Sequence, residues 1–298
     1  MVAAAPSITA RRAWWSAVRP ATLAASVAPI LTGTAIAVHE GGPRWGAGIG
    51  ALIVGLGMQL GVNFANDYSD FVRGADARRA GPLRAASSGV VDPEHVRFAA
   101  IGAFGVAALA GALVSLAVDW RLLVVGAACV LAGWLYTGGP RPYGYLGLGE
   151  VFVFIFFGLV ATIGTVYVET SQITSLSVLM GCAMGFLATA ILVLNNLRDI
   201  DSDAAAAKRT LATRVGRERT RILLAVLVAA AFAVPILVFV THLASVTIML
   251  VHFAIPIASV PVRAAFVSTA APALVHALKR MAIAQLAYAL LFTLGLLL

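Results

Sequence analysis

The feature that most restricts the fold of this chain is a series of almost uncharged apolar stretches, each near the length that a helix needs to cross a membrane. Backbone groups in hydrocarbon must be hydrogen-bonded internally, so only helices and closed barrels span it, and the strand-like alternation of a barrel is missing. We therefore predict an all-α, polytopic integral membrane protein with about nine transmembrane helices. The predicted spans are residues 22–38, 46–65, 97–118, 121–138, 150–168, 176–195, 220–240, 244–262 and 280–298.

Composition and charge distribution agree with this class. Only 11% of the residues are charged, against about a quarter in soluble domains. When the loop 67–96 is placed in the cytosol, every Lys and Arg except Arg44 and Arg121 falls on the cytosolic side. The net charge of +8 is then a consequence of topology. We predict a multi-pass protein of the cell membrane that contacts membrane lipids, has a cytosolic N-terminus and does not bind nucleic acid.

The first polar cluster, residues 63–76, directly follows an apolar stretch. Its carboxylates and carboxamides recur at helical spacing, so they share one helix face at the end of a span. They are Asn63, Asn66, Asp67 and Asp70, with Asp76 beyond the expected end of the helix. Such groups are costly at the edge of a membrane, which indicates a functional site.

The second cluster, residues 195–209, repeats the pattern at the end of another apolar stretch. Asn196, Asp199 and Asp203 are again spaced three and seven apart, whereas Asp201 is predicted to point off their face. Two such clusters suggest two metal ions, or one metal-bridged polyanion, held between two helices. A third segment, Tyr136 to Glu150, is rich in glycine and proline, which specify turns, and its tyrosines can face a ligand. All three segments fall on the same side of the predicted topology.

Carboxylates beside arginine and lysine suit a magnesium-bound phosphate or diphosphate, because Mg²⁺ takes a few carboxylates together with substrate oxygens. The sequence contains no nucleotide-binding glycine loop and no nucleophile elbow. The diphosphate is thus expected as the leaving group of a lipid, such as a polyprenyl diphosphate, whose departure leaves an allylic carbocation.

The motifs match a known family in detail. They read NFANDYSDFVRGAD, then GPLR, then YTGGPRPYGYLGLGE, and finally NNLRDIDSD followed by KRTLATRVG. This series resembles the UbiA-type membrane prenyltransferases, and within them the MenA-like branch that uses 1,4-dihydroxy-2-naphthoate. The resemblance covers nearly the whole chain and implies one transferase domain over residues 1–298. It also implies nine helices around a central lipid-accessible cavity, a cytosolic cap, and Mg²⁺-dependent transfer of a polyprenyl group with loss of diphosphate and CO₂, giving demethylmenaquinone in menaquinone biosynthesis.

The resemblance also implies roles for individual residues. The metal ligands would be Asn66, Asp70, Asp76, Asn196, Asp199 and Asp203. The diphosphate contacts would be Arg198, Lys208 and Arg209, and to these we add Arg73 of the first cluster as a further candidate. The candidate catalytic residues are Asp70, Asp199, Lys208 and Tyr143. The family usually has glycine before the lysine, where this chain has Ala207, and an alanine costs about 1 kcal/mol there if the loop needs a positive φ.

The aromatic acceptor is assigned to the third segment. Tyr136, Arg141 and Tyr143 can stack on its ring, pair with its carboxylate or polarise its hydroxyl, and Arg84 is a competing partner for the carboxylate. The alternative is that this segment only makes a tight connection. Other functions also stay open: a 4-hydroxybenzoate or homogentisate acceptor, a CDP-alcohol phosphotransferase, or a membrane transporter. The isoprenoid length and the oligomeric state are left open.

Overall fold

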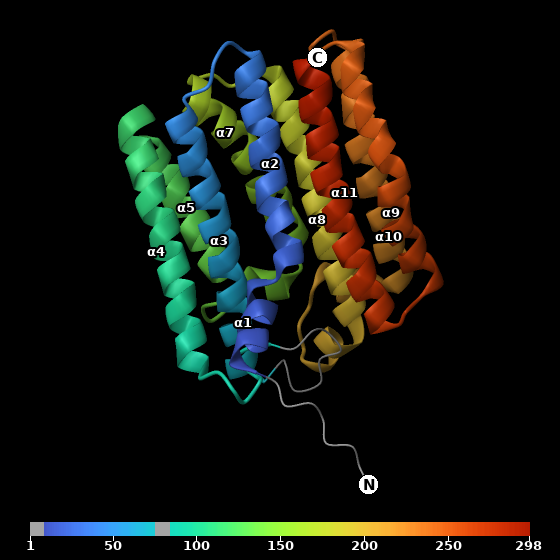
Figure 1. Ribbon diagram of the computed structural model, residues 1–298. Helices are drawn as coiled ribbons and strands as arrows, with labels where there is room; N and C mark the ends of the chain where they lie inside the picture. The colour runs from blue at the N-terminus through green and yellow to red at the C-terminus, as the bar shows by residue number, and fades with distance from the viewer. Residues whose placement is uncertain (1–8, 75–83) are drawn as a thin grey trace.

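The computed structural model describes residues 9–74 and 84–298, and its described part is almost entirely helical and contains no strand. Long helices run roughly parallel to one another as a bundle (Figure 1). In chain order they are α1 (Ala10–Val18), α2 (Pro20–His39), α3 (Trp45–Val72), α4 (Pro93–Val118), α5 (Leu122–Leu135), α6 (Gly149–Val153), α7 (Ala161–Thr170), α8 (Ser175–Ala205), α9 (Leu211–Val240), α10 (Ile255–Val267) and α11 (Ala271–Leu297). Three further helical segments join them. Two are 3-10 helices, η1 (Tyr143–Leu146) and η3 (Val246–Ala254), and one is a π-helix, η2 (Phe154–Val160).

The predicted spans each fall on helical structure. Within the described residues, eight helical segments are long and apolar enough to cross a membrane, and the shorter apolar helix Leu122–Leu135 occupies the place of the remaining predicted span. Several apolar side chains on the outside of the bundle are exposed, as lipid contact requires. Leu109, Leu113 and Leu116 of α4 recur at helical spacing and are 61–72% exposed. The protein is therefore a multi-pass membrane protein.

Local sequence signals explain where the helices begin. Asp92 caps α4 by accepting a hydrogen bond from the Glu94 backbone N–H, and Pro93 occupies the first turn. Thr174 and Ser177 form a reciprocal capping box at the start of α8. Helix α9 is kinked at Gly216, where φ is 81°, a conformation that glycine adopts at little cost.

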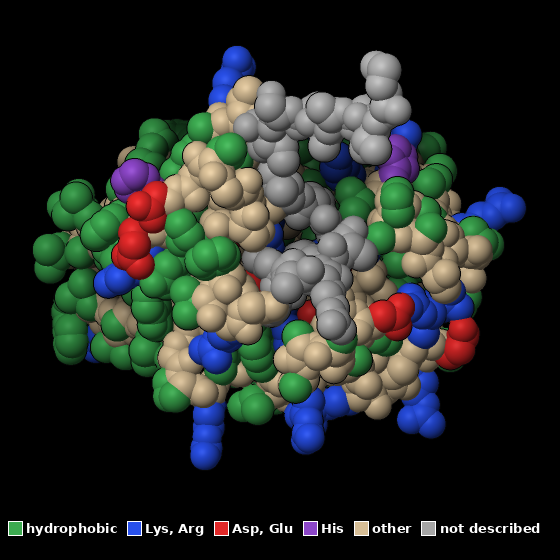
Figure 2. All heavy atoms as spheres, turned by 90° about the horizontal axis from the view of Figure 1, so that it is seen from below, with side chains coloured by type: hydrophobic (Ala, Val, Ile, Leu, Met, Phe, Trp, Pro, Cys, Tyr) green, Lys and Arg blue, Asp and Glu red, His purple; other side chains and the backbone are tan. Residues whose placement is uncertain are grey.

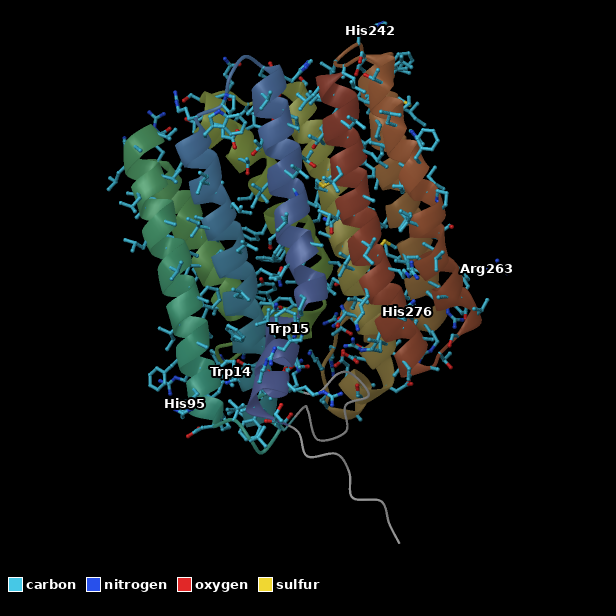
Figure 3. The ribbon with its side chains drawn as sticks, viewed as in Figure 1. Trp14, Trp15, His95, His242, Arg263 and His276 are labelled. Atoms are coloured by element: carbon cyan, nitrogen blue, oxygen red, sulfur yellow. The ribbon has the colours of Figure 1, made fainter. Side chains whose placement is uncertain are left out.

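The core lies in two parts. The larger apolar cluster joins α2, α8, α9, α11 and η3, and the smaller one joins α1, α3 and α4. Most of the α8 residues are buried, so α8 runs through the bundle and carries the second acidic cluster on its end. Figure 3 shows Trp14, Trp15 and His95 near one end of the bundle and His242 at the other. The end that bears Trp14 and Trp15 also carries the acidic clusters.

Candidate active site

The three polar segments meet at one end of the bundle, as predicted from the sequence. The Arg209 backbone N–H donates to the Tyr145 carbonyl at 3.2 Å, and Arg73 donates to the Gly139 carbonyl at 2.5 Å. Arg73 also lies over the Tyr145 ring, 5.5 Å from its centroid. Figure 2 looks at this end and shows Lys and Arg side chains gathered around its edge. A polyanion would therefore find positive charge here.

Two residues of the first cluster are structural. Asn63 donates to the Val18 carbonyl at 2.9 Å. Asp67 accepts hydrogen bonds from the backbone N–H groups of Ala85 and Ala86, at 2.9 and 3.3 Å. Their side chains thus fix the segments that flank α3, because buried polar groups of this kind are stable only when hydrogen-bonded.

Asp70 is the centre of the first cluster. It is 2% exposed. It accepts from Arg84 at 2.7 Å and from the Tyr145 hydroxyl at 2.6 Å, and it lies 3.8 Å from the Lys208 ammonium. Burial and the neighbouring Asp70 carboxylate raise the pKa of Tyr145, so its phenol stays protonated and donates. The predicted ligand Asp76 lies outside the described residues.

The second cluster has the predicted face. Asn196 and Asp199 are buried, whereas the Asp201 side chain is 91% exposed and the Asp203 side chain only 13% exposed. Asp199 and Arg198 form a two-point ion pair, with Nε–Oδ1 at 2.7 Å and Nη2–Oδ2 at 2.5 Å. The helical spacing therefore predicted correctly which of these side chains turn inward.

Lys208 joins the two clusters. Its ammonium nitrogen lies 3.8 Å from both Asp70 and Asp203 and 4.8 Å from the centroid of the Tyr145 ring. The preceding residue, Ala207, has a φ of 55°, the left-handed conformation that was predicted to disfavour alanine. This turn places Lys208 between the acidic helices α3 and α8.

We expect Ala207→Gly to stabilise the fold by about 1 kcal/mol, because glycine occupies a positive φ without steric cost. The measurement is the unfolding midpoint of the purified protein in detergent. Ala204→Gly is the matched control: Ala204 lies within α8, where the same change should destabilise. A lower unfolding midpoint in Ala207→Gly than in the parent would contradict the claim that the backbone at Ala207 is strained.

The oxygen donors of the two clusters fit a divalent cation. Asn66 and Asp70 lie on α3, and Asn196, Asp199 and Asp203 lie on α8. Within residues 9–74 and 84–298, no three His, Cys, Asp or Glu side chains converge as a metal cage. That donor set suits Mg²⁺, which prefers a few carboxylates completed by substrate phosphate oxygens over an all-protein site.

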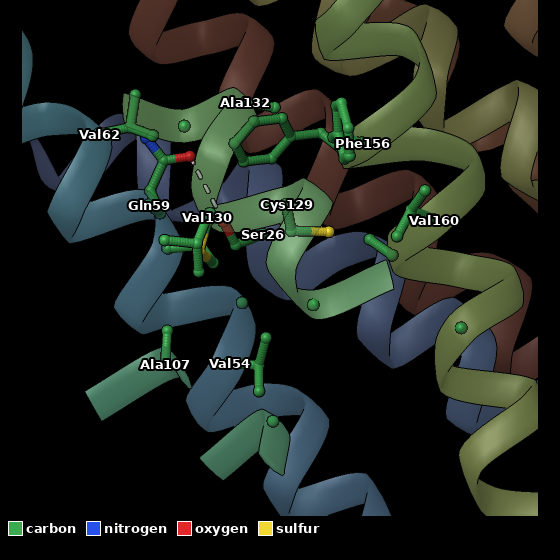
Figure 4. A pocket seen from close by; sticks show the side chains of 18 of the residues that line it. Ser26, Val54, Gln59, Val62, Ala107, Cys129, Val130, Ala132, Phe156 and Val160 are labelled. Carbon is green, nitrogen blue, oxygen red and sulfur yellow. Dashed lines mark hydrogen bonds between the residues drawn. The ribbon is translucent and has the colours of Figure 1, made fainter. Parts of the chain in front are cut away.

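An apolar cavity of about 800 Å³ opens beside the acidic clusters. Its walls come from α2, α3, α4, α5, η2, α7 and α8 (Figure 4). Asn66 and Asn195 line the end near the clusters, while Val54, Val160 and Val168 belong to the apolar remainder. A cavity with one polar end and a long apolar part suits a lipid that carries a charged head.

The third segment contributes two tyrosines to the cavity. Tyr136 and Tyr143 line it with their rings 5.4 Å apart, edge to face. The Tyr143 hydroxyl donates to the Ala132 carbonyl at 2.8 Å, and its ring stacks on Phe152 at 4.0 Å. Arg141 is exposed and is not among the lining residues. The structure thus brings the two tyrosines, but not Arg141, to the cavity.

Arg19 lines the cavity and was not predicted as a site residue. It connects α1 to α2 with a φ of 51°, an unfavourable conformation for a residue with a side chain. Among the described residues, its Nη2 atom is buried and has no hydrogen-bond partner. Its neighbours Arg84 and Arg198 are paired with Asp70 and Asp199. The sequence signal that could have identified it is an arginine directly before the first span.

Glu150 is a second residue that the sequence did not single out. It is 7% exposed at the start of α6 and accepts a hydrogen bond from the Asn196 side-chain Nδ2 at 2.9 Å. The segment Tyr136 to Glu150 thus ends on a direct contact with the second acidic cluster.

A buried pair of acidic clusters beside an apolar cavity, on a multi-helix membrane bundle, fits a membrane enzyme whose substrate has an apolar chain and an anionic head. The sequence matches the UbiA prenyltransferase family over residues 26–286, and the chain belongs to this family. The predicted family is therefore confirmed.

Individual relatives agree with this family assignment. A protein of Mycobacterium tuberculosis named 1,4-dihydroxy-2-naphthoate octaprenyltransferase is 44% identical over 232 residues, which cover 78% of each chain. A protein of the same name from Escherichia coli is 38% identical over 72% of each chain. Among solved structures, a UbiA homologue from Archaeoglobus fulgidus bound to GPP and Mg²⁺ has a TM-score of 0.62 at 14% identity, covering 94% of this chain and 99% of that one.

Proposed function

We propose that this protein transfers a polyprenyl group from polyprenyl diphosphate to 1,4-dihydroxy-2-naphthoate, with release of diphosphate and CO₂. The observation that carries the proposal is the bridge of Lys208 between Asp70 and Asp203 at the polar end of an apolar cavity. The names of the relatives at 38–44% identity support the same acceptor.

The acidic clusters would hold the diphosphate end through Mg²⁺. Asn66, Asp70, Asn196, Asp199 and Asp203 are the oxygen donors for the ion, which when bound neutralises the diphosphate and stabilises it as a leaving group. The related protein bound to GPP and Mg²⁺ supports this cofactor. The basic residues Arg73, Arg198, Lys208 and Arg209 supply positive charge to the remaining phosphate oxygens.

The apolar walls would hold the isoprenoid chain and keep water from the reacting carbon. Bond breaking between that carbon and the diphosphate oxygen leaves positive charge on the allyl group. Tyr136 and Tyr143 place aromatic rings in the cavity wall, where they can stabilise such charge and stack on the acceptor. The new carbon–carbon bond then forms to the acceptor ring, which loses its carboxylate as CO₂.

The acceptor carboxylate would pair with Arg19. Arg84 is committed to Asp70 at 2.7 Å, and Arg141 is exposed away from the cavity lining. Arg19 lines the cavity with a buried Nη2 that no described residue engages. A buried guanidinium in this position is favourable once a carboxylate reaches it.

The direct test uses the purified protein in detergent with Mg²⁺, one polyprenyl diphosphate and three acceptors: 1,4-dihydroxy-2-naphthoate, 4-hydroxybenzoate and homogentisate. We expect a prenylated, decarboxylated product from the naphthoate alone, and none after chelation of the metal. Turnover of another acceptor in preference to the naphthoate would reassign the substrate. Failure of every acceptor, with uptake of a solute in proteoliposomes, would instead favour a transporter.

We further propose that the site faces the cytosol of a cell membrane, because the basic residues gather at this end. Single cysteines at Arg73, Arg141 and Arg214 should react with an impermeant maleimide only after the cytosolic side is exposed. A cysteine at Glu40, which lies beyond α2 at the opposite end, should react from outside. Labelling of the first three positions from outside would reverse the orientation.

A further inference from the structure

The segment from Tyr136 to Glu150 contacts both acidic clusters through three side-chain hydrogen bonds, two of them buried and one partly buried. The three bonds are Thr137 Oγ1 to Asn66 Oδ1 at 2.6 Å, the Tyr145 hydroxyl to Asp70 Oδ1 at 2.6 Å, and Asn196 Nδ2 to Glu150 Oε1 at 2.9 Å. Each joins this segment to one residue of a cluster. The segment is therefore placed to set the orientation of the residues that would hold the metal and the diphosphate.

Glu150 is the most unusual member of this set. Its side chain is buried, and its Oε2 atom has no hydrogen-bond partner among the described residues. In residues 9–74 and 84–298, no Lys or Arg forms an ion pair with it. Burying a carboxyl group without a cation is costly, and an apolar residue of similar size would be cheaper at a purely structural position. A role in the candidate active site would explain why a glutamate occupies this buried position.

The chemistry of the Asn196 amide shows what that role is. An asparagine side chain has a donor end, Nδ2, and an acceptor end, Oδ1, whereas a carboxylate can only accept. Glu150 therefore binds Nδ2 and leaves Oδ1 on the opposite side of the planar amide. Only Oδ1 can bind a cation, and Asn196 shares its helix face with Asp199 and Asp203.

We propose that Glu150 is a positioning residue that fixes the Asn196 amide so that its Oδ1 is presented to the divalent ion and its diphosphate. The inference rests on the metal–diphosphate part of the proposed function, and it is independent of which aromatic acceptor is used. Partners that orient a metal ligand in this way typically contribute about 10–100-fold to metal affinity.

Two substitutions of similar volume separate this role from its alternatives. Glu150→Gln keeps an acceptor for Nδ2, so the productive orientation remains available. Glu150→Met fills the space but cannot accept the bond. The probe is Mn²⁺ with inorganic diphosphate, followed by electron paramagnetic resonance of the free Mn²⁺, because it needs no turnover. We expect Glu150→Gln to bind close to the parent, and Glu150→Met to bind about 10–100-fold more weakly.

The matched control is Glu169→Met. Glu169 is also buried, and it accepts from Thr34 at 2.7 Å, but its α7 position next to Ser171 and Arg44 lies at the opposite end of the bundle. Its replacement should leave Mn²⁺–diphosphate binding unchanged. The unfolding midpoint of each variant shows whether it is folded.

Two outcomes would overturn the proposal. Parent-like binding by Glu150→Met would show that Glu150 only fills space. Equal weakening in the Gln and Met variants would show that the negative charge, and not the orientation of Asn196, is required. If the parent binds Mn²⁺ and diphosphate but prenylates no naphthoate, the proposed acceptor fails while the role of Glu150 can still be tested.

Discussion

Replacing Asp70 or Asp199 by asparagine is expected to lower kcat by at least about a hundredfold, the scale on which removal of one electrostatic contact to a transition state acts. Asparagine is the better substitution than alanine, because Arg84 and Arg198 are buried against these carboxylates. Both substitutions remove the negative charge, but asparagine keeps an oxygen that accepts from the buried guanidinium, whereas alanine would leave those donors without an acceptor and lower stability further. Steady-state turnover of protein purified from the membrane fraction measures the effect.

Asp201→Asn is the control for this prediction. Asp201 lies on the same helix between Asp199 and Asp203, but its side chain is 91% exposed and pairs with Arg217 at 3.0 Å. Exposed ion pairs contribute little to stability, so both kcat and the unfolding midpoint should change little. Equal loss of kcat in Asp199→Asn and Asp201→Asn would show that the helix face does not decide function.

The second large effect is expected at Arg19. Arg19→Gln should lower kcat/KM for 1,4-dihydroxy-2-naphthoate by about a hundredfold, because truncating one partner of a buried charge pair costs about 3 kcal/mol. KM for the prenyl diphosphate should stay near the parent value. The variant and the parent should differ much less with 1,4-dihydroxynaphthalene, which lacks the carboxylate.

The same measurements on Arg141→Ala test the assignment made from the sequence. Arg141 is exposed outside the cavity lining, so its replacement should leave the acceptor KM close to the parent. An acceptor KM that rises in Arg141→Ala but not in Arg19→Gln would show that Arg141 of the third segment, and not Arg19, binds the acceptor carboxylate. If Arg19→Gln instead raises KM for the prenyl diphosphate, Arg19 binds the diphosphate.

Features that depend on residues close together in the chain could be predicted from the sequence. Apolar length located the spans, because a helix in lipid must cover a nearly constant thickness. The three-and-seven spacing placed Asn196, Asp199 and Asp203 inward and Asp201 outward, because the helix repeat sets the direction of a side chain. The sequence indicated that Ala207 would be unfavourable if its loop needs a positive φ, and the structure shows that its φ is 55°.

Spacing could not distinguish ligands from structural residues on one helix face. Asn63 and Asp67 share the repeat of Asn66 and Asp70, yet they hydrogen-bond to backbone groups of flanking segments. Their partners come from positions 18, 85 and 86, and the helix repeat carries no information about such contacts. The role of each residue therefore depends on which segment packs against it.

The sequence by itself determined the membrane class, the positions of the spans, the family and the two acidic faces, because each follows from hydrophobic length, helical spacing or contiguous motifs. Only the tertiary structure decided the partners of the buried charges. It paired Arg84 with Asp70, placed Arg19 in the cavity wall and set Glu150 against Asn196. These contacts join residues 14 to 46 positions apart, and they form only when helices and loops pack together, because a short-range polar contact requires atoms within about 3 Å of each other.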